Sequence, residues 1–566
     1  MPPPDRSRLR ELTCLIAIAA VSSLWIVTAS ERIGATFDEP VYLRAGLNGW
    51  RTGSHRDLLR MGTMPLPADV QTLPLYLLER WRGSEWNLDD DFASALSIAR
   101  FMTLPFWWLL LVFAWRAGRM IGGNWSGVAA AAVVACEPNL LAHAGLATTD
   151  IALTATLVAF LVQYRSGRDV ESRIRRVVVS GLLYGAALIA KASALAFAPI
   201  CMVAVELERR VRMDWNGESI VRGWRPFVYE TVHIGMIGLA TAFLFCGSDW
   251  LSEPSFVAWS HGLNEGPLKS IMVPVAENLR IFSNAGEGIA RQIKHNLRGH
   301  GAYLLGQSSD NAFWFYFPVL FTMKLAAPML IAVALIAAVR RAALINWALF
   351  AAAALAVFSL NCRVQIGIRL VLPCVALLAV GLASAAVTAV RSISNPRVAL
   401  AWRVVGIAGF GWMIVNSMSC WPDGLRFVNE FWGGTRGAYR LVSDSNYDWG
   451  QGLPELAAWQ RRNDIDQIDV WYFGTDPAFR HLPVHDCPLH AMSLQSPSDV
   501  RDIVAGRRLA VGATVLYGHG LTPSHRRAAE FLRACRPVAE AGTFLIFDFR
   551  SMDSGLVRQS RQDRSQ

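Results

Sequence analysis

Eleven apolar stretches recur along the chain, each near the length of about 20 residues that a helix needs to cross a hydrocarbon core of roughly 30 Å. They lie at residues 12–30, 95–115, 125–142, 149–164, 176–190, 192–207, 228–246, 314–338, 342–360, 366–389 and 401–419. This pattern predicts a mostly α-helical protein that crosses a membrane many times. The two short stretches on either side of Lys191 leave open a second interpretation, in which they form one broken helix.

The composition agrees with a membrane location. Hydrophobic residues make up 53% of the 566 residues and charged residues 17%, against roughly 25% in ordinary soluble domains. The mean hydropathy is +0.30. These values exclude a disordered chain and a purely soluble protein. The formal charge of +10 is modest for this length, and no Lys/Arg cluster is interleaved with a recognisable RNA- or DNA-binding module, so nucleic acid is not the expected partner.

Arginine-rich segments alternate with the apolar stretches. They lie at residues 116–119, 165–176, 209–225, 340–341 and 391–403. Basic loops stay in the cytoplasm, so the pattern predicts eleven crossings from a cytoplasmic N-terminus. The first stretch lacks a clear small-residue cleavage site, which favours a retained membrane helix over a signal peptide. Residues 31–92, residues 247–312 and the whole chain after 420 then lie outside the cytoplasm.

The chain changes character after residue 420. Residues 1–420 contain the apolar stretches and are expected to form the membrane-embedded unit. The rest has short apolar runs that predict strands at 467–473, 508–516 and 543–549, and amphipathic patterns that predict helices at 453–462, 498–505 and 524–535. We therefore expect a small extracytoplasmic α/β domain at 421–550 and a disordered tail at 551–566.

The cysteines give little evidence of a redox or zinc site. None of the nine belongs to a Cys-x-x-Cys pair, so neither a zinc ribbon nor a thioredoxin-like site is predicted. In an oxidising compartment Cys487 and Cys535 are candidates for a disulfide, but the sequence does not show whether their Cα atoms come close enough. That pairing stays open.

Metal ligation is not predicted either. His261, His295 and His300 share one outside loop, but their spacing matches no known ligand motif. The acidic run Asp89–Asp91 is more typical of the solvated start of a helix than of a cation site. We therefore predict no metal ligands, although a divalent cation remains an open cofactor.

The first outside loop begins with two adjacent carboxylates, Asp38 and Glu39, close to the end of the first apolar stretch. A carboxylate held in a partly apolar cavity at the membrane surface can accept a proton from an acceptor hydroxyl. The alternative is that Asp38 caps a helix that begins near Pro40. Position alone does not decide between these interpretations.

Four further charged groups are expected on the same face. Asp150 stands at the start of the fourth stretch, where capping is again the simpler explanation. Lys191 interrupts apolar sequence, and an intramembrane cation marks a functional site unless its side chain reaches the interface. Arg363 and Arg369 border the tenth stretch on the outside, where arginine is unusual, so either an anionic partner or lipid headgroups bind there.

Several separated segments resemble the GT-C superfamily of membrane glycosyltransferases, and in particular its protein O-mannosyltransferase and aminoarabinose-transferase-like group. The matching residues, in the same order, are 37–40 with 45, 46 and 50, then 137–150, 181–193, 301–306 with 316–318 and 324, 365–369 with 372 and 373, and finally 443–451 and 472–477. The resemblance extends over nearly the whole chain.

This resemblance implies an inverting transferase of the inner membrane of a prokaryote, with a GT-C-type bundle of about eleven membrane helices. It implies that Asp38 acts as the base on the acceptor and that Glu39 supports it or binds the acceptor. By the same correspondence, His143 and Asp150 line the catalytic cavity. Members of the group differ in metal dependence, so the resemblance does not decide whether a cation takes part.

The resemblance also implies the partners. A polyprenyl-phosphate sugar is the donor, a hydroxyl on a protein, lipid or glycan is the acceptor, and Lys191 with Arg369 neutralises the departing phosphate. Two other classes remain. A transporter predicts polar groups at the bilayer midplane and two similar halves, which the sequence does not show. An inactive sugar-binding or lipid-binding module would retain the fold without the chemistry.

Overall fold

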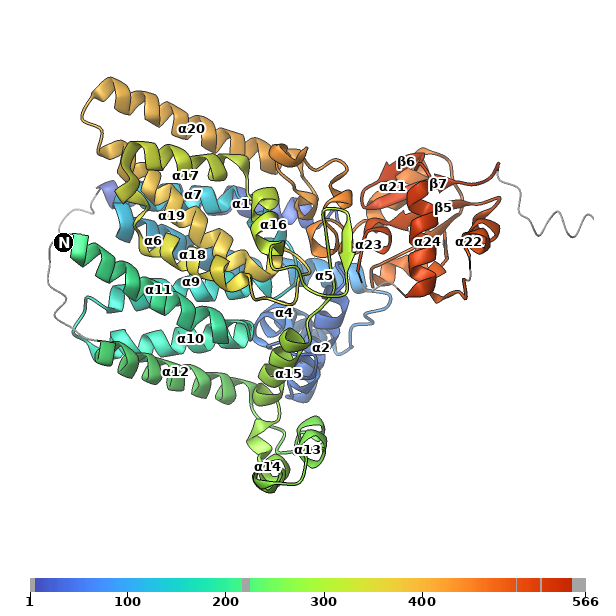
Figure 1. Ribbon diagram of the computed structural model, residues 1–566, viewed down its shortest axis with the longest axis horizontal. Coiled ribbons are helices and arrows are strands. Elements are labelled where there is room, and N and C mark those ends of the chain that lie inside the picture. The colour runs from blue at the N-terminus through green and yellow to red at the C-terminus, as the bar shows by residue number, and fades with distance from the viewer. Residues whose placement is uncertain (1–5, 216–223, 495, 520–521, 552–566) are drawn as a thin grey trace, which may run out of the picture.

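Long helices lie side by side in one body of the computed structural model, and a small α/β unit lies at one end of them (Figure 1). The structure describes residues 6–215, 224–494, 496–519 and 522–551. The helices of the main body are α1 (Arg6–Ser30), α5 (Phe92–Phe101), α6 (Leu104–Gly122), α7 (Asn124–Ala135), α8 (Pro138–Ala144), α9 (Asp150–Gly167), α10 (Val179–Ala190), α11 (Ala194–Trp215), α12 (Trp224–Cys246), α16 (Tyr316–Lys324), α17 (Ala327–Arg340), α18 (Trp347–Ser359), α19 (Leu372–Arg391) and α20 (Pro396–Ser419).

Each predicted apolar stretch contains a helix, but fewer than eleven are long and apolar enough to cross a membrane. Among the described residues six segments meet that criterion, or seven if α7 and α8, bent by 68° at their junction, form one span. The six are Ser7–Ser30, Phe92–Gly122, Trp224–Cys246, Ala327–Leu344, Ile368–Arg391 and Pro396–Ser419. Helices α9, α10, α11 and α18 occupy the other predicted stretches and are shorter or more polar.

Two breaks refine the predicted helix boundaries. The stretch predicted as one helix over 314–338 is instead α16 followed by α17, because the chain leaves the helical conformation after Lys324 and resumes it at Ala327, with Pro328 in the first turn. At the second break Lys191 is extended, with φ −163° and ψ 134°, between α10 and α11. Helices α9, α10, α11 and α12 lie side by side (Figure 1).

The two long segments that the sequence predicts to lie outside the cytoplasm fold into short elements. The first contains α2 (Glu39–Thr52), α3 (Arg56–Arg60) and α4 (Leu66–Arg82), and the second contains α13 (Pro254–His261), α14 (Pro267–Asn278), α15 (Ala285–Arg298) and the hairpin strands β1 (Ala302–Leu304) and β2 (Gln307–Ser309). Helix α2 packs against α4, and Trp50 donates from Nε1 to the Asp69 carbonyl at 3.0 Å. The α2–α4 layer therefore provides a fixed platform beside the helix ends.

The small unit after α20 contains a mixed five-stranded sheet. Its order is β4-β3-β5-β7-β6, with β3 parallel to β4 and β5, and β7 antiparallel to β5 and β6. The strands are β3 (Ile468–Trp471), β4 (Val484–Asp486), β5 (Arg508–Gly512), β6 (Ala539–Ala541) and β7 (Phe544–Asp548), and the helices are α21 (Leu453–Arg462), α22 (Pro497–Val504), α23 (Ala513–Leu516) and α24 (Pro523–Ala534).

The three predicted helices and the strands predicted at 467–473 and 543–549 are confirmed. The strand predicted over 508–516 was too long, because it ends at Gly512 and Ala513–Leu516 form the helix α23. Cys487 and Cys535, whose pairing the sequence left open, are both free thiols. Of the tail predicted to be disordered, Ser551 is described and residues 552–566 lie outside the described residues. The small sheet therefore has no disulfide between these two cysteines.

Candidate active site

Asp38 forms an ion pair and does not cap the helix that follows it. Its side chain makes no capping hydrogen bond to α2, and Arg369 Nη1 donates to Asp38 Oδ2 at 2.9 Å. Arg369 lies in a 3₁₀ turn, Ile368–Val371, immediately before α19. The Asp38 side chain is 22% exposed and the Arg369 side chain 9%, so the pair is reachable from one side only. The structure therefore joins the start of α2 to the start of α19.

Asp150 and Lys191 form a second ion pair next to the first. Thr149 and Asp150 begin α9 without a side-chain cap, and Lys191 Nζ lies 2.5 Å from Asp150 Oδ1. The Asp150 carboxylate is buried and interacts electrostatically with Arg369 as well as with Lys191. The extended backbone at Lys191 is what allows its side chain to leave the α10–α11 junction and reach Asp150. Two acids and two cations thus gather in one cluster.

His143 completes the group of residues expected from the sequence. It lies on the short helix α8, is fully buried and interacts electrostatically with Asp150 and Arg369. Its Nδ1 has no hydrogen-bond partner among the described residues, and neither has Arg369 Nε. A buried polar atom without a partner is costly, so atoms of this kind are available to a ligand.

Glu39 occupies a different environment although it is adjacent to Asp38 in the sequence. It is completely buried and accepts five hydrogen bonds, from Arg100 Nε and Nη2, from the amides of Thr36 and Ala147, and from Thr36 Oγ1, at 2.7–3.0 Å. Burial alone would raise the pKa of Glu39, but the Arg100 guanidinium and these donors hold the pKa below its usual value. The carboxylate anchors the start of α2.

A segment of the tail, residues 443–451, contributes site residues to which the sequence assigned no role. The Arg369 guanidinium lies over the Trp449 indole, 4.0 Å from the ring centroid, and the His143 ring lies 6.2 Å from the same indole. Asp444 is buried and interacts electrostatically with Arg369. We call residues 443–451 the strap. Its sequence is a run of alternating polar and aromatic residues, and the burial of these polar residues beside the helix ends is a tertiary property.

The strap is fixed directly to the turn that contains Arg369. Asn446 Oδ1 accepts from the Ile368 amide at 3.0 Å, and Ser445 Oγ donates to the Ile366 carbonyl. Gly367 has φ 141°, and a Cβ atom there would collide with the Ser445 side chain, so this position requires glycine. The buried Lys324 donates from Nζ to the Asn446 carbonyl at 3.0 Å. The strap therefore holds the turn that contains Arg369, and Lys324 holds the strap.

The tail also holds the loop that precedes Asp38. The Gly34 amide donates to the Gln451 carbonyl at 2.8 Å, and the Phe37 amide donates to the Trp449 carbonyl at 2.8 Å. A Cβ at Gly34 would come within 3.0 Å of the Gln451 carbonyl, so a larger residue would force the loop away from the strap. Asp476 accepts from the Ala35 amide at 2.7 Å. The small α/β unit thus positions the carboxylate of Asp38.

Arg363, His261 and Asp89 make their contacts outside the cluster. Arg363 is exposed and donates to the Leu297 carbonyl at 3.2 Å. His261 pairs with Glu277 at 2.9 Å, and Asp89 with Arg44 at 2.6 Å. Within the described ranges no group of three or more His, Cys, Asp and Glu side chains is arranged to hold a metal ion.

Asp444 gives the site a testable pH dependence. Burial raises the pKa of Asp444 to about 7, although the nearby Arg369 charge acts in the opposite direction, and the Asp38 and Asp448 carboxylates add to the rise. The folded protein therefore binds more protons at this group than the unfolded chain between about pH 4 and pH 7, so folding stability falls as the pH rises through this range. We expect Asp444→Asn to remove part of that slope, measured as the thermal unfolding midpoint in detergent from pH 5 to pH 8. Parallel curves for the wild type and the variant would contradict the prediction.

Comparisons with known proteins give structural similarity only. No protein family and no curated protein matches the sequence. ArnT from Cupriavidus metallidurans bound to undecaprenyl phosphate is 14% identical, with a TM-score of 0.43 over 94% of this chain and 97% of that one. The oligosaccharyltransferase AglB from Archaeoglobus fulgidus, in complex with an inhibitory peptide and a dolichol-phosphate, is 12% identical, with a TM-score of 0.48 over 96% of this chain and 75% of that one. Identities and scores this low do not identify an activity or a site residue.

Proposed function

We propose that this protein is an inverting GT-C-type glycosyltransferase that moves a sugar from a polyprenyl-phosphate donor to a hydroxyl acceptor. The observation that carries the proposal is the cluster in which the Asp38–Arg369 pair, at 2.9 Å, lies beside the Asp150–Lys191 pair, at 2.5 Å. A carboxylate next to two cations combines a proton acceptor with charge to stabilise a leaving phosphate. A transporter would instead place such groups at the bilayer midplane.

Asp38 is the proposed general base. Its Oδ2 is engaged by Arg369, while no hydrogen bond from the described part of the chain reaches Oδ1. In the proposed reaction the acceptor hydroxyl gives its proton to Oδ1 and its oxygen bonds to the anomeric carbon of the sugar. The bond from that carbon to the phosphate oxygen breaks at the same centre, and the electron pair leaves with the polyprenyl phosphate. Attack opposite the leaving group inverts the configuration.

Arg369 and Lys191 are the proposed phosphate-binding residues. The donors not used by Asp38, among them the unpartnered Arg369 Nε, are available to an anionic group. Charge that develops on the departing phosphate is stabilised by cations already fixed in place, which is the largest single contribution in many enzymes. His143 and Asp150 line the same cluster, and we propose that they contact the sugar.

Of the two roles that the sequence resemblance implies for Glu39, support of Asp38 and binding of the acceptor, we propose the first. Its five hydrogen bonds leave it no free oxygen for a substrate. By fixing the first turn of α2 it fixes the backbone that carries Asp38.

The proposal includes several crossings of the plasma membrane of a prokaryote, with a cytoplasmic N-terminus and with the unit at 421–550 outside. Helices α6 and α19 end on the side of the main body away from that unit (Figure 1). Arg119, in the last turn of α6, lies 3.5 Å from Glu11, and Arg391, at the end of α19, donates to the Gly122 carbonyl. This distribution supports the orientation that the arginine-rich loops predict. The Asp38 cluster then faces the periplasmic or external side.

The test is release of polyprenyl phosphate by the purified protein from a panel of polyprenyl-phosphate sugars with undecaprenyl and dolichyl chains. A membrane extract supplies hydroxyl acceptors. We expect acceptor-dependent release and a product of inverted anomeric configuration. No release from any donor, combined with solute flux in proteoliposomes, would overturn the proposal in favour of a transporter.

Arg369→Lys tests the phosphate-binding assignment. Lysine keeps the charge but loses the planar fork that both pairs with Asp38 and lies on Trp449, so we expect kcat/KM for the donor to fall about tenfold. The matched control is Arg363→Lys, an exposed arginine six residues earlier, for which we expect wild-type kinetics. Equal kinetics for both variants would show that the guanidinium of Arg369 has no special role.

A further inference from the structure

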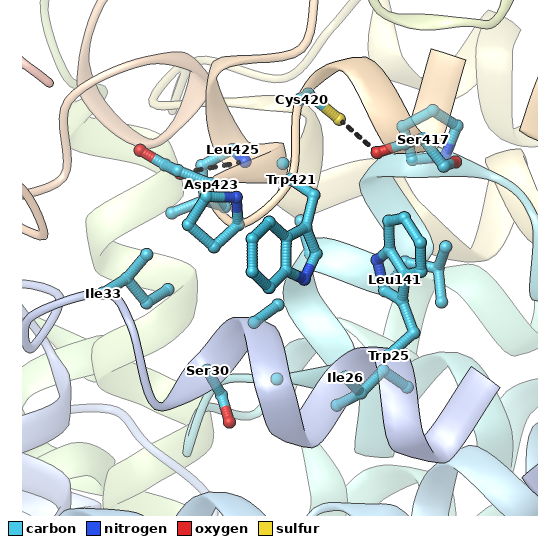
Figure 2. A pocket seen from close by; sticks show the side chains of 16 residues that line it. Trp25, Ile26, Ser30, Ile33, Leu141, Ser417, Cys420, Trp421, Asp423 and Leu425 are labelled. Carbon is cyan, nitrogen blue, oxygen red and sulfur yellow. Dashed lines mark hydrogen bonds between the residues drawn. The ribbon is translucent and has the colours of Figure 1, made fainter. Parts of the chain in front are cut away.

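An apolar recess lies beside α8, and its lining includes none of the residues of the charged cluster (Figure 2). It is formed by the end of α1, by α8, by the last turn of α20 and by the residues up to 425 that follow it. Figure 2 shows the Trp421 indole above the helix that contains Trp25, Ile26 and Ser30. The recess is a shallow hollow, open on one side, between two long apolar helices.

The interior of the recess offers hydrocarbon contacts and few free polar groups. Trp25, Ile26 and Leu141 line it together with Trp421. The one carboxylate, Asp423, is already occupied, because Arg426 lies 2.9 Å from its Oδ2 and Gln451 Nε2 donates to it at 2.9 Å. Its charge is thus balanced within the protein, and an alkyl chain is the ligand chemistry that such a lining favours.

A cation lies beside Trp421. The guanidinium of Arg32, which follows α1, lies 4.5 Å from the centroid of the Trp421 ring. Arg32 is exposed, and no carboxylate among the described residues lies within ion-pair distance of it. An arginine that stacks on an indole keeps its donor fork free for a phosphate. The charge and the apolar recess together match an amphipathic anion.

The helices around the recess face lipid and not protein. Only 17% of the apolar window of α1 and 11% of that of α20 is buried within the protein. Trp25 and Trp421 stand near the ends of these helices, at the level where tryptophan marks the boundary between hydrocarbon and headgroups. A membrane lipid thus has direct access to the recess.

We propose that this surface binds an anionic glycerophospholipid of the surrounding bilayer, with an acyl chain lying against the apolar lining of the recess and its phosphate on Arg32. This site is separate from the proposed reaction. None of Asp38, Asp150, Lys191 or Arg369 lines the recess, and the chain of hydrogen bonds from Asp423 through Gln451 to the Trp449 amide lies between them. The phosphate of a polyprenyl-phosphate donor would bind Arg369, whereas the phosphate of the proposed phospholipid would bind Arg32. The bound lipid would brace α8, which contains His143, against the strap.

Native mass spectrometry of the purified protein tests this proposal with added phosphatidylglycerol and phosphatidylcholine that have identical acyl chains. We expect phosphatidylglycerol to bind about fivefold more tightly, the scale of one arginine near an anionic headgroup. Arg32→Gln should abolish the preference, whereas Arg298→Gln, an exposed arginine outside the recess, should keep it. Equal binding of the two lipids, or the same result for both variants, would overturn the charge assignment.

A second pair of variants tests the recess itself. Ala29→Phe fills space inside the recess, whereas Val21→Phe adds the same side chain to the exposed surface of the same helix. We expect the first variant to weaken binding of phosphatidylglycerol at least about fivefold and the second to leave it unchanged. If both bind as the wild type, the recess is not the site. If undecaprenyl phosphate, and not phosphatidylglycerol, loses binding in Arg32→Gln and Ala29→Phe, the recess serves the carrier and the proposal is wrong.

Discussion

Asp38→Asn lowers the rate of sugar transfer by a factor of about 10²–10⁴, the range that a general base contributes. Asparagine preserves the size of the side chain and one oxygen for Arg369, but it cannot take a proton from the acceptor hydroxyl. Because donor binding rests on Arg369 and Lys191, we expect KM for the donor to change little and kcat to carry the loss. The measurement is the initial rate of polyprenyl phosphate release over a range of donor concentrations.

The matched control for this experiment is Asp91→Asn, an exposed carboxylate of the same outside segment whose side chain makes no capping bond. We expect it to have the wild-type rate. Asp38→Glu should retain part of the activity, since a carboxylate is still present but displaced by one methylene. Equal rates for Asp38→Asn and Asp91→Asn, in proteins with the same thermal unfolding midpoint, would exclude Asp38 as the base.

The charged cluster could be anticipated in part because its members stand at helix ends. Asp38, Asp150 and Arg369 each lie within a few residues of an apolar stretch, so the positive-inside rule places them on one face. The structure brings them into contact, with the Asp38–Arg369 ion pair at 2.9 Å. The strap could not be anticipated in this way. Trp449 follows Phe37 by more than 400 residues, and their hydrogen bond depends on how the tail folds back onto the helix ends.

The sequence could not distinguish the roles of two adjacent carboxylates. Asp38 and Glu39 look equivalent in the sequence, but successive residues at a helix start point in different directions, so one faces Arg369 and the other Arg100. The strands β4 and β6 were missed because three residues are too few for an alternating pattern to be detected. The break between α16 and α17 was missed because apolar sequence continues through it.

Glu39→Gln lowers the free energy of unfolding by about 3–5 kcal/mol, the cost of breaking a buried ion pair by removing one charge. Arg100 would remain buried, with a side-chain exposure of 3%, and would lose its counter-charge, while the amides of Thr36 and Ala147 would lose a charged acceptor. The folded-state pKa of Glu39 lies below its unfolded value. Its contribution to stability is therefore present above the unfolded pKa of about 4.3 and is lost as the pH falls through the folded value.

The measurement is the unfolding midpoint of the detergent-solubilised protein by heat and by denaturant, with Glu85→Gln as the control. Glu85 is exposed and pairs with Arg51 at 3.3 Å on the surface, so its loss should cost no more than about 1 kcal/mol. Because Arg100→Met removes the unpaired charge, the double variant Glu39→Gln/Arg100→Met should regain part of the stability lost in Glu39→Gln. If Glu39→Gln were as stable as Glu85→Gln but lost its transfer activity, Glu39 would take part in the chemistry directly, and the positioning role would be wrong.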